Sequence, residues 1–233
     1  GMYEVLRSRW RLGPESVIKP SVLMRQSALA WVKRIRAGCA TTAVASQSGV
    51  ISLRSFDTCL VLASDACKEG AEIPGIGGFF AGHWWFYPYQ PSHLELDIPV
   101  LELVAFAVNL VVFQDLIAPF VEESPNNLVV ALIDAQASPQ ILANSSAKSP
   151  VMQFAHRLLV NLSAYKAVEN NLAVAQTFGE SNFAADCASR GKIERLCRYC
   201  AQIGVKPRRC NVPNIATRML DQIVEFQRSL PAV

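Results

Sequence analysis

The sequence has few charged residues, and it has no hydrophobic run long enough to cross a membrane. Charged side chains make up 18% of the 233 residues and hydrophobic ones 51%, which provides for a large core and excludes a disordered chain. A membrane-spanning helix needs roughly 18 consecutive apolar residues. The longest apolar segment, residues 98–113, is shorter and contains Glu102. We therefore expect no membrane partner, and a single domain with extensions.

Signals for disulfides, zinc and histidine chemistry are also weak. The seven cysteines are an odd number, and the N-terminal segment GMYEVLRSRWR lacks the apolar centre of a signal peptide. We therefore expect reduced thiols in an intracellular protein. Only one CxxC pair occurs where a zinc ribbon usually has two, so no zinc is expected at the four clustered cysteines, Cys187, Cys197, Cys200 and Cys210. The histidines His83, His93 and His156 stand apart, and we interpret them as structural.

The apolar pattern predicts an α/β protein with a mixed sheet. Helical spacing covers residues 20–37, and residues 39–58 are expected to form a linker with one short strand. The predicted strands are 59–65, two within 75–89 joined by a turn near Gly82, 126–135 and 171–179. The other predicted helices are 99–116, 138–146, 149–167, one from about 181 that is broken near Gly191, and 213–230. This order predicts an antiparallel meander followed by strands reached through helical crossovers.

Four acidic residues occupy positions where an α/β sheet builds its sites. Asp65 and Asp134 end apolar strands, Glu102 lies near the start of the intervening helix, and Asp186 lies in the first turns of a later helix. Each alone has an ordinary interpretation, as a turn former, a solvated helix residue or a favourable first-turn acid. Together they would repel one another unless hard divalent cations lie between them. The sequence therefore predicts a site for Mg²⁺, in which two ions could support phosphodiester cleavage.

Local motifs around these acids resemble those of a known family. The segments ASDAC, GIGGFFAGHWW, LELDIPVLELVAFAV, VVALIDAQAS and GESNFAADCASRG are similar to the ribonuclease H domain of retroelement reverse transcriptases, most closely those of DIRS-like retrotransposons. The resemblance spans residues 57–191. Residues 1–56 resemble the polymerase connection segment, and residues 192–233 would form a C-terminal helical extension.

The resemblance implies a fold, an activity and a ligand set. It implies a ribonuclease H-like α/β fold with a five-stranded mixed sheet flanked by helices, whose strands 1–3 form the meander and whose strands 4 and 5 are parallel. It also implies Mg²⁺-dependent cleavage of the RNA strand of RNA–DNA hybrids by two metal ions, with Mn²⁺ as a substitute. The catalytic and metal-binding residues would be Asp65, Glu102, Asp134 and Asp186. The polymerase domain of the same polyprotein is an expected partner. The loop Lys68–Pro74 is longer than the family pattern, and the loop before Asp186 lacks the His that many members have.

Basic and small polar residues near the acids are candidates for nucleic-acid binding. Between residues 190 and 209 the sequence has one acid, Glu194, against seven cations: Arg190, Lys192, Arg195, Arg198, Lys206, Arg208 and Arg209. We predict phosphate contacts from Arg190, Lys192 and Arg195, and contacts to RNA 2′-hydroxyls from Ser64, Gln136 and Ser138. The alternative for the cations is an ordinary solvated helix face. The net charge of +3 permits a nucleic-acid partner without requiring one.

Two other functions remain open. The same fold could serve as a catalytically weak or inactive module with a structural role, or bind nucleic acid or protein without cutting. It could also belong to another nuclease or recombinase, because acids at strand ends do not fix the substrate.

Overall fold

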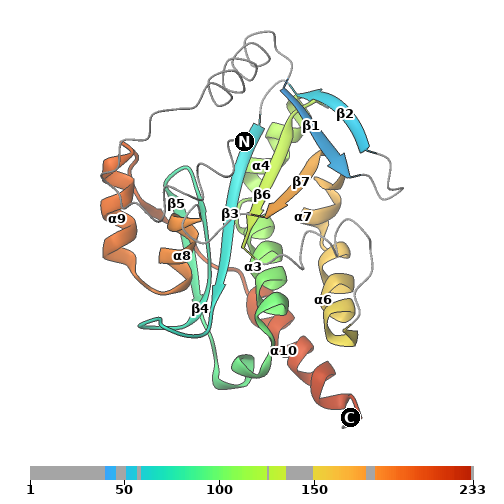
Figure 1. The fold of residues 1–233 in the computed structure, drawn as a ribbon, viewed down its shortest axis with the longest axis vertical. Coiled ribbons are helices and arrows are strands. Elements are labelled where there is room, and N and C mark those ends of the chain that lie inside the picture. Colours follow the sequence, from blue (N-terminus) through green and yellow to red (C-terminus); the bar gives the residue numbers. More distant parts are fainter. Residues whose placement is uncertain are drawn as a thin grey trace, which may run out of the picture.

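The structure is a computed structural model, and it describes residues 40–45, 51–56, 59–124, 126–134, 149–176 and 182–231 (Figure 1). The helices predicted over 20–37 and 138–146 lie outside the described residues, as do Gln136 and Ser138. Residues 40–45 and 51–56 form a separate antiparallel pair, β1 (Ala40–Ala45) and β2 (Ile51–Phe56). The sequence predicted one short strand in that region, so the second strand is a correction.

A mixed sheet lies at the centre of the molecule. Its strands are β3 (Cys59–Cys67), β4 (Gly75–Phe80), β5 (His83–Pro88), β6 (Leu128–Ile133), β7 (Leu172–Gln176) and β8 (Arg208–Arg209). Their order is β7-β6-β3-β4-β5-β8. Strands β3, β4 and β5 form an antiparallel meander, and β6 and β7 run parallel to β3. The predicted ribonuclease H-like fold is confirmed.

The sheet has one strand more than predicted. β8 contains only two residues and runs parallel to β5 at the sheet edge. It forms because the Arg208 N–H donates to the Gly82 carbonyl at 2.9 Å and the Cys210 N–H donates to the Trp84 carbonyl at 2.7 Å. The predicted turn near Gly82 is confirmed. Ala81 and Gly82 both have positive φ, 46° and 88°, as a two-residue hairpin with right-twisting strands requires.

Helices cover the sheet, and two that the sequence predicted as continuous are broken. They are α3 (Ile98–Val112), α4 (Gln114–Glu123), α6 (Pro150–Val160), α7 (Ser163–Lys166), α8 (Phe183–Ser189), α9 (Ile193–Gln202) and α10 (Ile215–Ser229), with short 3₁₀ turns η1 (Pro91–Glu95) and η2 (Glu169–Asn171). The helix predicted over 99–116 bends by 71° between α3 and α4, where Phe113 leaves helical backbone angles. The helix predicted over 149–167 is interrupted at Asn161 and Leu162. The predicted break near Gly191 is confirmed, with φ +68°.

The main core lies between one face of the sheet and helices α3, α6 and α10. Every residue of α3 from Val100 to Leu110 is buried, which explains why its sequence is apolar on all sides. Leu220 and Ile223 of α10 are fully buried in the same core. Among the described residues, no single helix is long and apolar enough to span a membrane; α3 and α4 reach that length and composition only as a bent pair.

A second, smaller core lies on the opposite face of the sheet. Trp84 of β5 packs there against Cys187 and Ala188 of α8 and against Leu196 and Cys200 of α9. Helices α8 and α9 therefore cover β4 and β5 from the side away from α6 and α7 (Figure 1). Side chains alternate across β3, so Leu60 and Leu62 enter the main core whereas Asp65 faces α8.

Candidate functional site

Asp65 is buried within β3, two residues before the strand ends. Its side chain is 4% exposed, and its Oδ2 accepts a short hydrogen bond from the Ser189 hydroxyl of α8. Across the sheet it pairs with Gly77, whose missing side chain leaves room for α8. A Cβ at Gly77 would lie 2.5 Å from the Ser189 nitrogen. The close approach of α8 to β4 thus places a hydroxyl donor beside the buried carboxylate.

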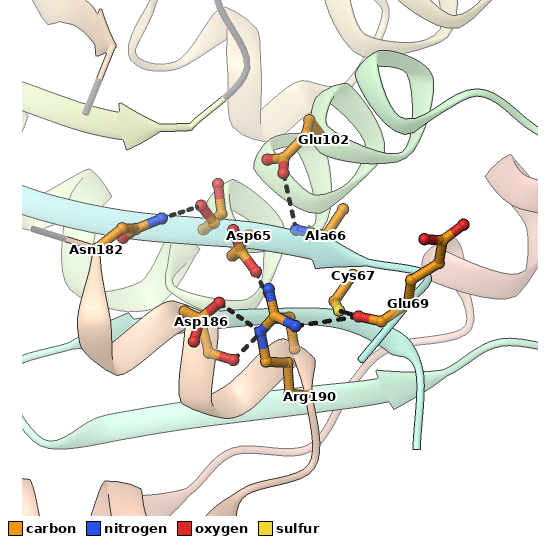
Figure 2. A network of polar contacts seen from close by, with 10 residues as sticks. Asp65, Ala66, Cys67, Glu69, Glu102, Asn182, Asp186 and Arg190 are labelled. Atoms are coloured by element: carbon orange, nitrogen blue, oxygen red, sulfur yellow. Dashed lines mark hydrogen bonds and ion pairs between the residues drawn. The ribbon is translucent and has the colours of Figure 1, made fainter. Parts of the chain in front are cut away.

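Glu102 extends from α3 toward the same end of β3. It is 2% exposed, and its Oε1 accepts a hydrogen bond from the Ala66 backbone N–H at 3.1 Å, next to Asp65 (Figure 2). Its other carboxylate oxygen, Oε2, is buried without a hydrogen-bond partner among the described residues. The Tyr89 hydroxyl is likewise buried without a hydrogen-bond partner among the described residues. Burial and the negative charge of Glu102 both raise the pKa of Tyr89, so its hydroxyl remains protonated.

Asp134 and Asp186 approach Asp65 from β6 and α8. Asp134 directly follows β6, which is paired in parallel with β3 so that Leu132 lies beside Ala63. Two residues further along both strands, Asp134 lies beside Asp65 on the same face. Asp186 lies in the first turn of α8, the helix whose Asn182 side chain donates to the Ser64 carbonyl at 2.8 Å. Four elements therefore bring the four predicted acids to one region of the sheet.

The four acids are here called the acid cluster, and the pKa values of three of them, Asp65, Glu102 and Asp134, are raised. Burial is the main cause of the raised pKa of Asp65, about 7 against its usual 3.8, and the charges of Asp186 and Asp134 add to it. Burial first and then the charge of Asp65 raise the pKa of Glu102 well above its ordinary value. Burial and the charge of Asp186 also raise the pKa of Asp134. The cluster is therefore short of positive charge, which is the electrostatic setting that favours a bound cation.

Arg190 is the cation that lies in the acid cluster. Its Nε donates to Asp186 Oδ1 at 2.5 Å, and its Nη1 donates to the Glu69 carbonyl at 3.1 Å (Figure 2). Its charge lowers the pKa of both Asp65 and Asp134. We predicted Arg190 as a phosphate contact from the sequence, and its bond to Asp186 was missed. The i, i+4 spacing of these two residues on one helix is the signal that could have revealed it.

The long loop Lys68–Pro74 is fixed beside the acid cluster. The Lys68 ammonium donates to the Leu96 carbonyl at 2.6 Å, and the Glu69 carbonyl accepts hydrogen bonds from both Arg190 and the Cys67 thiol. Gly70 adopts a positive φ of 66°, which favours glycine. Hydrogen bonds therefore hold the loop against Leu96, directly after η1, and Arg190, directly after α8.

The donor chemistry of the acid cluster fits a hard divalent cation. All of its side-chain donors are carboxylate oxygens, the ligands that Mg²⁺ prefers, and the buried Glu102 Oε2 has no hydrogen-bond partner in the described part of the chain. The distances between the carboxylates are larger than those in a site that holds one ion. Among the described residues, no three acidic, histidine or cysteine side chains are close enough together to hold one ion. Asp186 Oδ1 and Asp65 Oδ2 are bound instead to Arg190 and Ser189.

Other predicted contact residues have different outcomes. Ser64 is 1% exposed and alternates with Asp65, so its side chain faces the opposite side of the sheet. The prediction that it contacts a 2′-hydroxyl is therefore wrong. Lys192 is partly exposed at the start of α9, and Arg195 is exposed with its guanidinium 4.8 Å from the centre of the Phe183 ring. Sequence reasoning did not single out Ser189 and Asn182 as site residues, although both lie in the segment GESNFAADCASRG that carries the resemblance.

Comparison with known proteins gives weak likenesses. No family model matches the chain, and no curated protein matches it. Two solved structures are similar at low identity. LC11-RNase H1, isolated from compost by a metagenomic approach, is 16% identical with a TM-score of 0.44 over 58% of this chain and 97% of that chain. RNase H1 from the halophilic archaeon Halobacterium salinarum is 11% identical with a TM-score of 0.42 over 58% and 98%. The strand order described above identifies the fold independently of these likenesses.

Proposed function

We propose that this chain is a divalent-metal-dependent endonuclease that cleaves the RNA strand of RNA–DNA hybrids, as a ribonuclease H domain of a retrotransposon reverse transcriptase. One observation carries the proposal. Glu102, Asp134 and Asp186 come from three further elements to the region of Asp65, and the pKa values of Asp65, Glu102 and Asp134 are raised. A fold gains no stability from such an arrangement, because buried like charges are costly. A site that binds cations and phosphates gives the arrangement a function.

Each group of the chain has a defined part in the proposed reaction. Asp65, Glu102, Asp134 and Asp186 would hold two Mg²⁺ ions, with Mn²⁺ as a substitute. When bound, the ions supply an activated water and positive charge at the leaving oxygen. Ser189 and the Ala66 N–H orient Asp65 and Glu102. Lys192 and Arg195, beyond the C-terminal end of α8, would contact substrate phosphates, and so would Arg190 once released from Asp186.

A cleavage assay tests the proposal directly. End-labelled RNA in an RNA–DNA hybrid is incubated with the protein and Mg²⁺ or Mn²⁺, beside single-stranded RNA, duplex RNA and duplex DNA. We expect cleavage of the hybrid RNA alone, and a loss of at least about 100-fold in rate for Asp65→Asn and Asp134→Asn. Asp115→Asn, an exposed acid on α4, is the matched control and should cut normally. Equal cleavage by all variants, or none by the wild type, would refute the proposal, and cleavage of duplex DNA would indicate another nuclease or recombinase.

A non-catalytic role has specific support and is the second candidate. Arg190 and Ser189 bind two of the carboxylates, and the described acids do not form a closed ion site. A module of this kind would bind hybrids in a salt-sensitive manner and would not cut them at any metal concentration. The same cleavage assay, combined with binding measurements, separates the two functions.

A further inference from the structure

A group of cations extends away from the acid cluster across α9 and β8. We call this group the α9–β8 surface, and it consists of Arg195, Arg198, Lys206, Arg208 and Arg209. All five side chains are exposed. None has a carboxylate partner among the described residues, and Glu194 is the one acid on α9. Surface cations usually lie among acids, so an unpaired group on two adjoining elements indicates an anionic partner.

Aromatic rings hold two of these arginines in place. The Arg195 guanidinium lies 4.8 Å from the centre of the Phe183 ring, and that of Arg209 lies 5.5 Å from the Trp84 ring. Trp84 and Phe183 belong to the second core, which fixes α9 against α8 and β5. Stacking orients an arginine and leaves its N–H groups free to bind phosphate. Both guanidinium groups are therefore ordered before a ligand arrives.

The surface begins beside the acid cluster and continues beyond it. Phe183, Asp186 and Arg190 are the partly exposed residues at the surface of α8, whose other residues are buried, so Arg195 lies over the helix that carries Asp186. None of the five cations shifts the pKa of Asp65, Glu102 or Asp134. In Figure 1, α9 lies on the far side of β5 from α3. The surface is thus adjacent to the acid cluster and shares no residue with it.

The length of the surface points to a polymeric anion. Arg195 and Arg198 lie about one turn apart on α9, and Lys206, Arg208 and Arg209 extend the surface over the following loop and β8. Double-stranded nucleic acid carries one charge per about 1.7 Å of axis, so its closely spaced phosphates can meet several of these separated cations at once. A mononucleotide could neutralise only one end of such a surface.

We propose that the α9–β8 surface binds the phosphate backbone of duplex nucleic acid, as a contact separate from the acid cluster. Under the proposed function this would be the part of the hybrid that flanks the cut, and in that respect the inference rests on the proposed function. Binding itself needs neither metal nor the four acids. The sequence of the duplex should have little influence, because backbone contacts carry no base information.

The test measures binding under conditions in which cleavage cannot occur. A fluorescent 20-base-pair RNA–DNA hybrid is titrated with the full chain in EDTA at several KCl concentrations, and Kd is read from anisotropy. The variant carries Arg198→Gln, Lys206→Gln and Arg208→Gln. It leaves Arg195 and Arg209 unchanged, because these two arginines lie over aromatic rings of the second core. Its matched control carries Arg157→Gln, Lys166→Gln and Arg218→Gln, three exposed cations on α6, α7 and α10. Both variants lose three positive charges, so long-range attraction falls equally.

We expect the α9–β8 variant to bind roughly tenfold more weakly at 0.1 M salt and its salt slope to fall by about 2 to 3, at about 0.9 per lost phosphate contact. The control variant should keep the wild-type slope. Equal weakening of both variants, or no change in either, would overturn the proposal. The proposal would also be overturned if polyglutamate displaced the labelled hybrid as well as unlabelled hybrid does, because the surface would then fit an acidic protein. A wild type that never cleaves but shows the expected binding difference would refute only the proposed function, and a cleaving protein without that difference would refute only this inference.

Discussion

At the scale of single residues, Asp65 makes the stability of the metal-free protein depend on pH. The folded protein binds the Asp65 proton more tightly than the unfolded chain, with a pKa of about 7 against 3.8. The free energy of unfolding should therefore fall as the pH rises from about 4 to above 7, on the order of a few kcal/mol. Thermal melts in EDTA should give a lower Tm at pH 8 than at pH 5, and Asp65→Asn should reduce the difference. A wild-type Tm that rises over this range would contradict the raised pKa; Asp115→Asn should behave as the wild type.

A second prediction at this scale concerns Arg190, because it is bound to a carboxylate oxygen that a metal would use. Its Nε is bound to Asp186 Oδ1. Arg190→Gln removes a competing cation, so Mn²⁺ should bind about threefold to tenfold more tightly, as measured by electron paramagnetic resonance of free Mn²⁺. Arg195→Gln removes one charge outside the acid cluster and should change the affinity much less. Weaker Mn²⁺ binding by Arg190→Gln would show that the arginine orders the acids rather than competing with the ion.

At the scale of elements, the sequence predicted what depends on local pattern and missed what depends on distant contacts. The runs that became β3, β6 and β7 are apolar, and glycines mark the β4–β5 hairpin, so these strands were predictable. The break at Phe113 was not, because no glycine or proline marks the bend and Phe113 is an apolar residue buried by tertiary packing. β8 has only two residues and depends on hydrogen bonds to Gly82 and Trp84, over 120 positions earlier. No periodic pattern can reveal a strand of that length.

Docking of α8 onto β4 should depend on the absence of a side chain at Gly77. A Cβ there would lie 2.5 Å from the Ser189 nitrogen and 2.7 Å from the Ala188 carbonyl carbon, both of them backbone atoms. Gly77→Ala should therefore lower the free energy of unfolding by about 1–3 kcal/mol in urea denaturation. It should also weaken Mn²⁺ binding, because α8 carries Asp186. Gly204→Ala, at a φ of +73° with nothing within 4 Å, is the control and should cost only backbone strain of about 1 kcal/mol without changing Mn²⁺ binding. Unchanged stability of Gly77→Ala would mean that α8 can shift away from the sheet.

At the scale of the whole molecule, the sequence placed the acids on the correct elements but could not give their spacing. Acids at strand ends and the family resemblance led to Asp65, Glu102, Asp134 and Asp186, and the structure brings these residues to one region. Their role as metal ligands remains a prediction. The position of Ser189 against Asp65 follows from the docking of α8, which depends on Gly77 and on the Asn182 contact with β3. Such contacts join segments over 100 residues apart, so composition and periodicity do not specify them.

The last prediction concerns α10, which closes the main core although it begins well after Asp186, the last acid of the cluster in the chain. Leu220 is fully buried, Phe226 stacks on Phe154 with ring centres 4.3 Å apart, and the His93 Nε2 lies 2.9 Å from Asp221 Oδ1. Because the Gln90 N–H donates to His93 Nδ1, the Nε2–H is the donor to Asp221. Leu220→Ala should therefore lower the free energy of unfolding of the whole protein by about 2–5 kcal/mol in one cooperative urea transition.

Gln222→Ala, an exposed position on the same helix, is the control for that variant and should change the free energy of unfolding by less than about 0.5 kcal/mol. The result decides how the chain divides. If residues 192–233 were an extension that folds apart from residues 57–191, Leu220→Ala would leave the main transition unchanged and would alter at most a separate, smaller one. A shift of the single transition would instead show that α10 and the sheet unfold together, so that the acid cluster depends on a helix that contributes no residue to it.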